Sequence, residues 1–388
     1  MSNTYIFALL LGLLGVFKAE TSAIIENSKL GENILLTLDL IGQKMCVHQC
    51  FYHSDCKAVN FNKRQLTCDL LTRSGQEEPG SLQYDSDYIH IYNLSNDQIS
   101  DFCANTSCPA HNRCVNGERK SLCVTSGCQT NGLTIINGNI RDDVIQVGST
   151  LEYTCLLGYA KRNIDIRCLS SGKIENAEKV ACFKMEGSWT IAFKIQSNSG
   201  AHPLNSFLDT GTQQERNSSF PSTCMTLTKV PECTTPYRTG LVDDWGQLGV
   251  QEIRFVITVN STLTQEIVFD GYNSTNFDWF TGSRVKSSTW SDVTNTQTYL
   301  HFNLPGDQRS TITRLWTIIK SYHGCAGDIG WFLASFNPTG GCAFDMTSNI
   351  PTVYPAFPVC PKSTACYFLS ETVEAETFAV LLKADKLS

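Results

Sequence analysis

The chain has 388 residues, of which 17% are charged, with a formal net charge of −7 and 18 cysteines. This length predicts two or three domains, and so many cysteines exclude a reducing compartment, where disulfides do not persist. The mild negative charge argues against nucleic acid as a partner, but it is far from the dense acidity of a polyanion.

An apolar run over residues 6–17 is followed by the small residues Ala19, Ser22 and Ala23. The run is too short to cross a bilayer comfortably, and small residues after such a run are typical of a cleavage site. We therefore expect residues 1–22 to be a secretory signal peptide. A second apolar run long enough for a membrane anchor does not occur, so the protein is expected to be secreted and extracellular, without a membrane span.

The cysteines divide into blocks of four, four, four and six, so each block can close its own disulfides. Even blocks predict that no thiol is left free and that the block boundaries are domain boundaries. The blocks are Cys46, Cys50, Cys56 and Cys68; Cys103, Cys108, Cys114 and Cys123; Cys128, Cys155, Cys168 and Cys182; and Cys224, Cys233, Cys325, Cys342, Cys360 and Cys366.

In the first block, Cys46 and Cys50 lie one helical turn apart, and two alternating runs, 56–62 and 65–71, follow them. A helix joined to a hairpin by nested bridges, Cys50–Cys56 inside Cys46–Cys68, would satisfy all four cysteines. This pattern resembles a PAN/apple domain, which we place at residues 23–95. As the resemblance implies, such domains bind proteins or carbohydrates.

The second block spans about 20 residues and has a turn signal at Asn116-Gly117. It resembles the first part of an EGF-like domain. A truncated EGF-like unit is therefore expected over residues 99–125, where it would serve as a stiff spacer.

In the third block, Val147, Leu151 and Tyr153 alternate as in a half-buried strand, and Gly158-Tyr159 follows. A segment of this size cannot bury enough apolar surface to be secure alone, so cross-links must supplement its core. The segment resembles a sushi (complement control protein) module over residues 126–184. That resemblance implies the pairs Cys128–Cys168 and Cys155–Cys182.

After residue 184 the cysteines become sparse, and alternating runs recur at 189–195, 251–259, 299–304, 328–334 and 377–383. Residues 185–388 are predicted to form one antiparallel β-sandwich, lectin-like or jelly-roll in outline. The whole chain is then mostly β and disulfide-rich, with a small α+β PAN-like domain. All six tryptophans lie in this region: Trp189, Trp245, Trp279, Trp290, Trp316 and Trp331.

The six cysteines of this last region allow fifteen connectivities. Proximity in the sequence favours Cys224–Cys233 and Cys360–Cys366, which leaves Cys325–Cys342. Five Asn-X-Ser/Thr sequons are candidate glycosylation sites, although a chain rich in Asn, Ser and Thr gives several by chance. They are Asn93, Asn105, Asn217, Asn260 and Asn273.

No HExxH, Gly-X-Ser-X-Gly, P-loop or Rossmann glycine pattern occurs in the sequence. His48 and His53 lie near the first helix, but surface or packing roles are favoured because no cysteine is left to join them as a ligand. A cysteine nucleophile would need an unpaired thiol. We therefore predict no catalytic residue and no metal ligand.

Three acidic patches are candidate Ca²⁺ sites, but none has EF-hand spacing, and solvated turns are the favoured interpretation. No cofactor is therefore predicted. The aromatic clusters at Trp279-Phe280 and Trp245 could stack on sugars, although most tryptophans in such a domain belong to the core. The acidic patches are Glu77-Glu78 with Asp85 and Asp87, Asp142-Asp143, and Asp243-Asp244.

The domain order and the Trp-rich C-terminal region resemble uncharacterised secreted proteins of the organic matrix of stony-coral skeletons. This resemblance implies a biomineral matrix protein. The leading hypothesis is a secreted, non-enzymatic matrix or adhesion protein that binds extracellular proteins or glycans. Two alternatives are a carbohydrate-binding lectin acting through the C-terminal β-domain and a secreted hydrolase, which would need a facing carboxylate pair.

Overall fold

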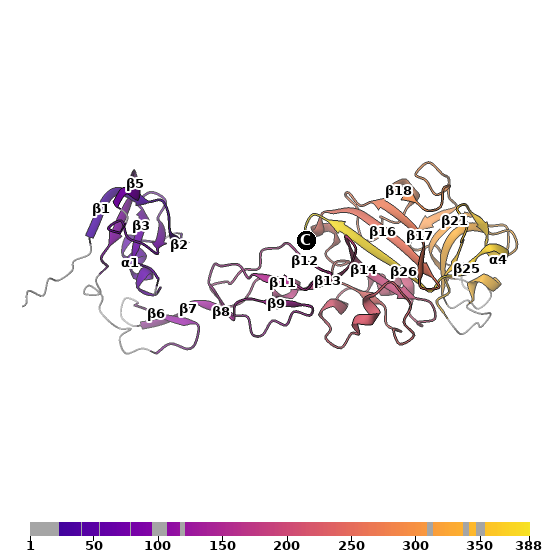
Figure 1. The fold of residues 1–388 in the computed structure, drawn as a ribbon, viewed down its shortest axis with the longest axis horizontal. Coiled ribbons are helices and arrows are strands. Elements are labelled where there is room, and N and C mark those ends of the chain that lie inside the picture. Colours follow the sequence, from indigo (N-terminus) through magenta and orange to yellow (C-terminus); the bar gives the residue numbers. More distant parts are fainter. Residues whose placement is uncertain are drawn as a thin grey trace, which may run out of the picture. The chain divides into compact units, whose positions relative to one another are not determined.

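The computed structural model describes residues 23–39, 41–53, 55–77, 79–94, 107–116, 121–308, 313–336, 341–346 and 354–388 (Figure 1). The chain is mostly β, with several antiparallel sheets and many disulfides, which confirms the predicted fold class. It divides into two compact units, Met1–Val124 and Thr125–Ser388. Among the described residues, no helix is long and apolar enough to cross a membrane.

The first unit contains a five-stranded antiparallel sheet with the order β1-β5-β3-β4-β2. Helix α1 (Gln43–Phe51) packs on β3 and β4, and the alternating residues Val59 and Phe61 of β3 bury their side chains against it. The strands are β1 (Ala23–Leu30), β2 (Ile34–Leu38), β3 (Ala58–Asn62), β4 (Thr67–Leu71) and β5 (Leu82–Tyr92), with the short 3₁₀ turn η1 (Pro79–Ser81) before β5.

Helix α1 has little local support of its own. It lacks a side-chain N-cap bond and an acidic residue in its first turn, and nine residues are marginal for an isolated helix. Two disulfides compensate, Cys46–Cys68 and Cys50–Cys56, the second nested inside the first. This is the pairing expected from the one-turn spacing of Cys46 and Cys50.

A hairpin of β6 (Asn112–Asn116) and β7 (Ser121–Thr125) follows, and the disulfide Cys108–Cys123 links the segment before β6 to β7. Cys103 and the side chain of Cys114 lie outside the described residues, as does the expected signal peptide, residues 1–22.

The second unit begins with a small segment of two two-stranded ladders, β10–β8 and β11–β9. Two disulfides, Cys128–Cys168 and Cys155–Cys182, surround a core that includes Leu151 and Tyr153. The strands are β8 (Gly127–Gln129), β9 (Gly138–Ile140), β10 (Val144–Gln146), β11 (Tyr153–Cys155) and β12 (Tyr159–Lys161), and the 3₁₀ turn η3 (Ala177–Lys179) follows.

One sheet runs from this segment directly into the C-terminal region. Strand β12 pairs with β13 (Cys182–Glu186), which pairs in turn with β14 (Trp189–Gln196). Ser388 also pairs with this sheet, because the backbones of Lys161 in β12 and Ser388 exchange two hydrogen bonds of 2.7 and 3.0 Å. The expected domain boundary between residues 184 and 185 therefore falls inside β13.

The C-terminal region is built from two sheets that share one core. The first has the order β12-β13-β14-β26-β16-β17-β18, with β15 beside β14; the second has the order β19-β21-β22-β23-β25, with β20 beside β21 and β24 beside β22 (Figure 1). The remaining strands are β15 (Tyr237–Arg238), β16 (Val250–Val259), β17 (Thr262–Asp270), β18 (Val285–Ser288), β19 (His301–Asn303), β20 (Asp307–Gln308), β21 (Thr313–Ser321), β22 (Ile329–Phe336), β23 (Pro358–Val359), β24 (Cys366–Tyr367), β25 (Val373–Glu374) and β26 (Thr377–Ala384).

Aromatic rings from both sheets meet in this core. Trp316 of β21 stacks on Phe193 and Phe255 of the first sheet, with ring centroids 6.1 and 5.9 Å apart. Trp316 has a φ of 51°, an uncommon conformation for a non-glycine residue, at a β-bulge in β21.

Short helical segments connect the strands, although the sequence shows no helical periodicity here. They are α2 (Pro203–Leu208), η4 (Gln214–Arg216), η5 (Ser222–Met225), α3 (Trp245–Leu248), η6 (Gly282–Arg284), η7 (Ala343–Asp345) and α4 (Phe368–Glu371).

Candidate functional site

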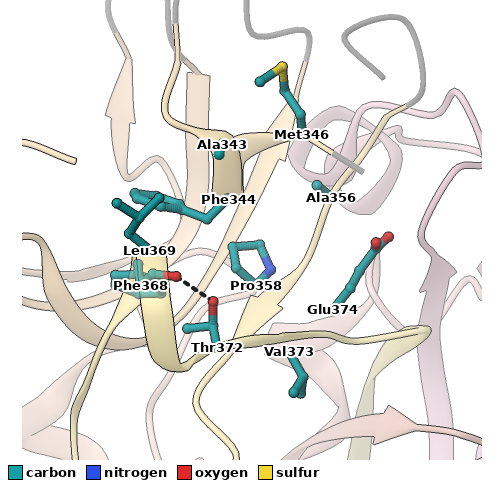
Figure 2. Close-up of a pocket in the computed structure, with 10 residues that line it drawn as sticks. All are labelled: Ala343, Phe344, Met346, Ala356, Pro358, Phe368, Leu369, Thr372, Val373 and Glu374. Carbon is teal, nitrogen blue, oxygen red and sulfur yellow. Dashed lines mark hydrogen bonds between the residues drawn. The ribbon is translucent and has the colours of Figure 1, made fainter. Parts of the chain in front are cut away.

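A groove of about 220 Å³ lies beside the second sheet, where η7, β23, α4 and β25 converge. Figure 2 shows Phe344, Phe368 and Leu369 on one side of Pro358, and Val373 and Glu374 on the other. Eight of the ten lining residues are apolar, although polar atoms contribute more of the exposed lining surface than carbon atoms do. The groove is lined by Ala343, Phe344, Met346, Ala356, Pro358, Phe368, Leu369, Thr372, Val373 and Glu374.

The floor and the rim of the groove differ in exposure. Phe344 and Phe368 are 9% and 1% exposed, and their rings pack on each other at 5.3 Å. Leu369 and Val373 are 46% and 39% exposed and form part of the rim. Enclosed small-molecule sites have volumes of roughly 300–1,000 Å³. The groove is smaller than this, so it suits one or two apolar side chains of a larger partner better than an enclosed substrate.

Disulfides fix the segments that build the groove. Cys342 immediately precedes η7 and is bonded to Cys325, while Cys360 and Cys366, which flank the turn before α4, are bonded to each other. At α4 the hydroxyl of Thr372 donates to the carbonyl of Phe368 (2.6 Å), as the dashed line in Figure 2 marks. The groove is therefore largely preformed, which lowers the entropy cost of filling it.

A buried arginine anchors η7 to the sheet. Arg314 donates from Nε and Nη2 to the two carboxylate oxygens of Asp345 (2.9 and 2.8 Å) and from Nη1 to Asp328 (3.2 Å). Its guanidinium also lies 4.9 Å from the ring centre of Phe344. Burial opposes the charge on Arg314, but the hydrogen bonds and charge of Asp345 outweigh burial and raise its pKa. This ion cluster holds the floor of the groove in place.

A second, more polar hollow of about 570 Å³ lies on the 126–184 segment next to the end of the chain. Glu152, Lys161, Asp165 and Lys386 place both signs of charge along it. Asp165 is paired with Arg167 at 3.0 Å. Such a mixed lining gives no preference for one charged ligand.

Beside this hollow, a small cavity is lined by two buried polar groups that lack some hydrogen-bond partners within the described part of the chain. Arg162 is 3% exposed and pairs with Asp244, but its Nε has no partner among the described residues. Glu215 is also 3% exposed; its Oε1 accepts the N–H of Gly240 (3.0 Å), and its Oε2 has no partner where the chain is described. Burial raises the pKa of Glu215 to about 7, and the bond from Gly240 opposes that rise.

The first unit contains a buried histidine on the sheet. The Nε2 atom of His90 accepts the N–H of Gly75 (3.0 Å), so the neutral ring carries its proton on Nδ1 and donates it to Oδ1 of Asn60 (2.9 Å). The Nδ2 of Asn60 in turn donates to the carbonyl of Leu30 (2.8 Å). Burial lowers the pKa of His90 to about 4. This network needs the neutral ring, since a protonated Nε2 cannot accept a bond.

Every cysteine pair suggested above that lies within the described residues is present in the structure. In the last region these pairs are Cys224–Cys233, Cys325–Cys342 and Cys360–Cys366. No free cysteine occurs in the part of the chain that the structure describes. Asn93, Asn217, Asn260 and Asn273 are exposed, and Asn105 lies outside the described residues.

The aromatic clusters suggested as sugar platforms are not available to a ligand. Trp279 and Phe280 are 0% and 1% exposed, and Trp245 is 3% exposed. Their rings fill the sandwich core, which is the interpretation that the sequence favoured over sugar stacking. The exposed aromatic residues of this region are instead Tyr272, Phe277 and Tyr367, which the sequence analysis did not single out.

Several of the suggested Ca²⁺ ligands are instead paired with basic residues. Glu77 pairs with Lys57 (3.0 Å), Asp85 with Lys29 (3.1 Å) and Asp87 with Arg64 (3.7 Å). Asp243 pairs with Arg238 (2.6 Å), and Asp244 with Arg162 and Lys179. Glu78 lies outside the described residues. Neither these residues nor His48 and His53 form a group that could hold a metal, as far as the chain is described.

A model of the PAN domain family matches residues 21–96. The N-terminal unit contains a PAN domain. The family assignment made from the first cysteine block is thus confirmed, and the nested disulfides and the buried His90 belong to this domain. PAN domains mediate binding to proteins or carbohydrates, and with so many disulfides the chain has the character of an extracellular adhesion protein.

Searches for relatives among curated proteins and among solved structures find no match. The groove residues were missed by the sequence analysis, because short separated apolar positions such as Leu369 and Val373 carry no motif. The cysteines on either side of these positions could have pointed to the groove, since disulfide-bridged turns can fix loops that form a binding surface.

Proposed function

We propose that the chain is a secreted, non-enzymatic protein of the extracellular matrix that adheres through more than one surface. The observation that carries this proposal is the presence, in one chain, of a PAN domain and of a separate compact unit with a preformed groove whose lining residues are mostly apolar. Each unit has its own core and its own disulfides. Two tethered sites raise the effective concentration of the second contact, so each can be weak while the whole chain binds tightly.

The proposed occupant of the groove is an apolar side chain of an extracellular protein. The small volume and the apolar floor of Phe344, Pro358 and Phe368 favour this choice over a polar small molecule. Among the described lining residues Glu374 is the one carboxylate, whereas glycoside hydrolysis needs two. The groove therefore supports recognition rather than hydrolysis.

The segments between the PAN domain and the sandwich complete the proposal. Residues 126–184 are proposed to be a sushi module, supported by the pairs Cys128–Cys168 and Cys155–Cys182. Residues 99–125 are proposed to be a truncated EGF-like spacer, supported by the hairpin and the Cys108–Cys123 bridge. The proposed setting is a skeletal organic matrix. There the protein would contact other matrix proteins, because its net charge of −7 is too mild for binding to mineral through dense charge.

Replacing Leu369 by glutamate is expected to weaken binding to an extracellular-matrix preparation about fivefold. The reason is that a half-exposed leucine at the rim loses about 1 kcal/mol of apolar contact with the partner. The measurement is surface plasmon resonance with the full-length protein over immobilised matrix.

Leu263→Glu is the matched control, because Leu263 is 40% exposed on β17 of the other sheet. It should bind like the unsubstituted protein. Equal losses in the two variants, or no loss in Leu369→Glu, would remove the groove from the proposed function.

A further inference from the structure

The loop that follows β17 presents two aromatic side chains to solvent. Tyr272 is 63% exposed and Phe277 is 47% exposed, whereas the adjacent Trp279 and Phe280 are buried in the core. The loop thus carries aromatic surface that its own fold does not cover. Two exposed aromatic groups in one short loop are candidates for covering by another molecule or by a covalently attached group.

The backbone of this loop is held in place from several directions. The guanidinium of Arg284 donates to the carbonyls of Asp270 (3.3 Å), Tyr272 (2.9 Å) and Asn273 (3.4 Å). The hydroxyl of Ser274 donates to the carbonyl of Gly271 (2.7 Å) and accepts the indole N–H of Trp245 (3.0 Å). Tyr272 and Asn273 therefore project from a preorganised backbone, so covering this part of the loop costs little loop entropy.

A sequon lies between the two rings in the sequence. It consists of Asn273-Ser274-Thr275, and Asn273 is exposed in the left-handed conformation with a φ of 52°. The side-chain amide of Asn273 makes no hydrogen bond within the described part of the chain. By contrast, the amide of Asn217 donates to Gln214 (3.0 Å) and its oxygen accepts the N–H of Ser219 (3.0 Å). The side-chain amide of Asn273 is therefore not tied to the described part of the protein and can accept a glycan, and the next residue in the sequence before it, Tyr272, is an exposed aromatic residue.

We propose that Asn273 carries an N-linked glycan whose first sugars pack on Tyr272 and Phe277. In the transfer step, Nδ2 of Asn273 attacks C1 of an oligosaccharide bound to a lipid diphosphate. The N–C1 bond forms, the C1–O bond to the diphosphate breaks, the lipid diphosphate leaves with the bonding electrons, and Nδ2 loses one proton. The proposal requires the chain to enter the secretory route but is independent of any adhesive function.

The packing follows from the chemistry of the sugar and from its attachment. A pyranose ring has a face of C–H groups, which can lie against the apolar face of an aromatic ring. The covalent link places that face beside Tyr272, the neighbour of Asn273, so the contact forms at a high effective concentration. The glycan would then cover apolar surface and stabilise the fold, rather than only extend into solvent.

Asn260 provides an internal comparison. It also lies exposed in the left-handed conformation, with a φ of 50°, at the turn between β16 and β17. The surrounding residues 256–264 include no aromatic residue. A glycan at Asn260 therefore has no adjacent ring in the sequence on which to pack.

The test uses full-length protein secreted from eukaryotic cells, with peptide mapping by mass spectrometry and thermal unfolding followed by tryptophan fluorescence. We expect a glycan on Asn273, and a fall of about 2–4 °C in the unfolding temperature for Asn273→Gln but not for Asn260→Gln. Enzymatic removal of the glycans from the unsubstituted protein should give the same fall. In a variant carrying Tyr272→Thr and Phe277→Thr, adding Asn273→Gln should cause no further fall.

An unmodified Asn273 would overturn the proposal. So would equal falls for Asn260→Gln and Asn273→Gln, an unchanged unfolding temperature after enzymatic removal, or a fall for Asn273→Gln that persists when both rings are absent. Each of these results would mean that the sugar does not pack on the two rings.

Discussion

Replacing Arg314 by leucine is expected to destabilise the second unit by about 3–5 kcal/mol. The guanidinium is the cation that the buried carboxylates of Asp328 and Asp345 share, and these residues are 3% and 0% exposed. Without Arg314 both carboxylates stay buried and keep backbone N–H partners, but they have no counter-ion among the described residues. Thermal unfolding followed by tryptophan fluorescence measures this loss, because all six tryptophans lie in this unit, and the unfolding temperature should fall by on the order of 10 °C.

The matched control is Arg254→Leu. Arg254 pairs with Glu266, but both side chains are partly exposed, so the expected loss is about 1 kcal/mol or less. Adding Asp345→Asn to Arg314→Leu should restore part of the stability, whereas Asp345→Asn alone should reduce it. If Arg314→Leu costs no more than Arg254→Leu, the ion cluster does not anchor η7 and the groove floor as described.

Lowering the pH from 6.5 to about 4 is expected to reduce the free energy of unfolding of the PAN domain by about 3 kcal/mol through His90 alone. The folded pKa of His90 is about 4, below the ordinary value of 6.5, so the unfolded chain binds more protons between these pH values. Stability from this group is therefore complete above pH 6.5 and is lost as the pH falls through 4. Hydrogen–deuterium exchange of β3 and β5 in the full-length protein measures the change.

His90→Gln should flatten this pH dependence between pH 4 and 6.5, whatever its effect on stability at neutral pH. His48→Gln, on helix α1, is the control and should keep the slope of the unsubstituted protein. Carboxylates also titrate in this range, so the difference between the two slopes is the quantity to compare. An unchanged slope in His90→Gln would show that the buried histidine does not set the acid sensitivity of the domain.

Local patterns in the sequence predicted much of the N-terminal fold. The one-turn spacing of Cys46 and Cys50 specified a helix bridged to the following strands, and the PAN assignment followed from those few residues. Alternating runs such as 251–259 likewise predicted strands of the sandwich, because one face of each is buried against the core. Disulfides such as Cys360–Cys366 could also be predicted, because the two cysteines are close in sequence.

Features that depend on contacts between residues far apart in the sequence could not be predicted from local patterns. Arg314 and Asp345 are 31 positions apart, and neither residue differs in its local pattern from an exposed charge. The continuity of β12, β13 and β14, closed by the pairing of Lys161 with Ser388, joins segments that the cysteine blocks separate. The tryptophans had two open interpretations, and only the packing of two sheets decides that Trp279 belongs to the core.

The proposal of adhesion through several tethered surfaces is tested most directly by comparing the full-length protein with its two units, residues 23–124 and 125–388, in binding to one extracellular-matrix preparation. The account predicts that each unit binds weakly and that the intact chain binds tighter by about 10²–10⁴-fold, because tethering concentrates the second contact. If either unit alone reproduces the affinity of the full-length protein, a single dedicated site is responsible and the multivalent account is contradicted.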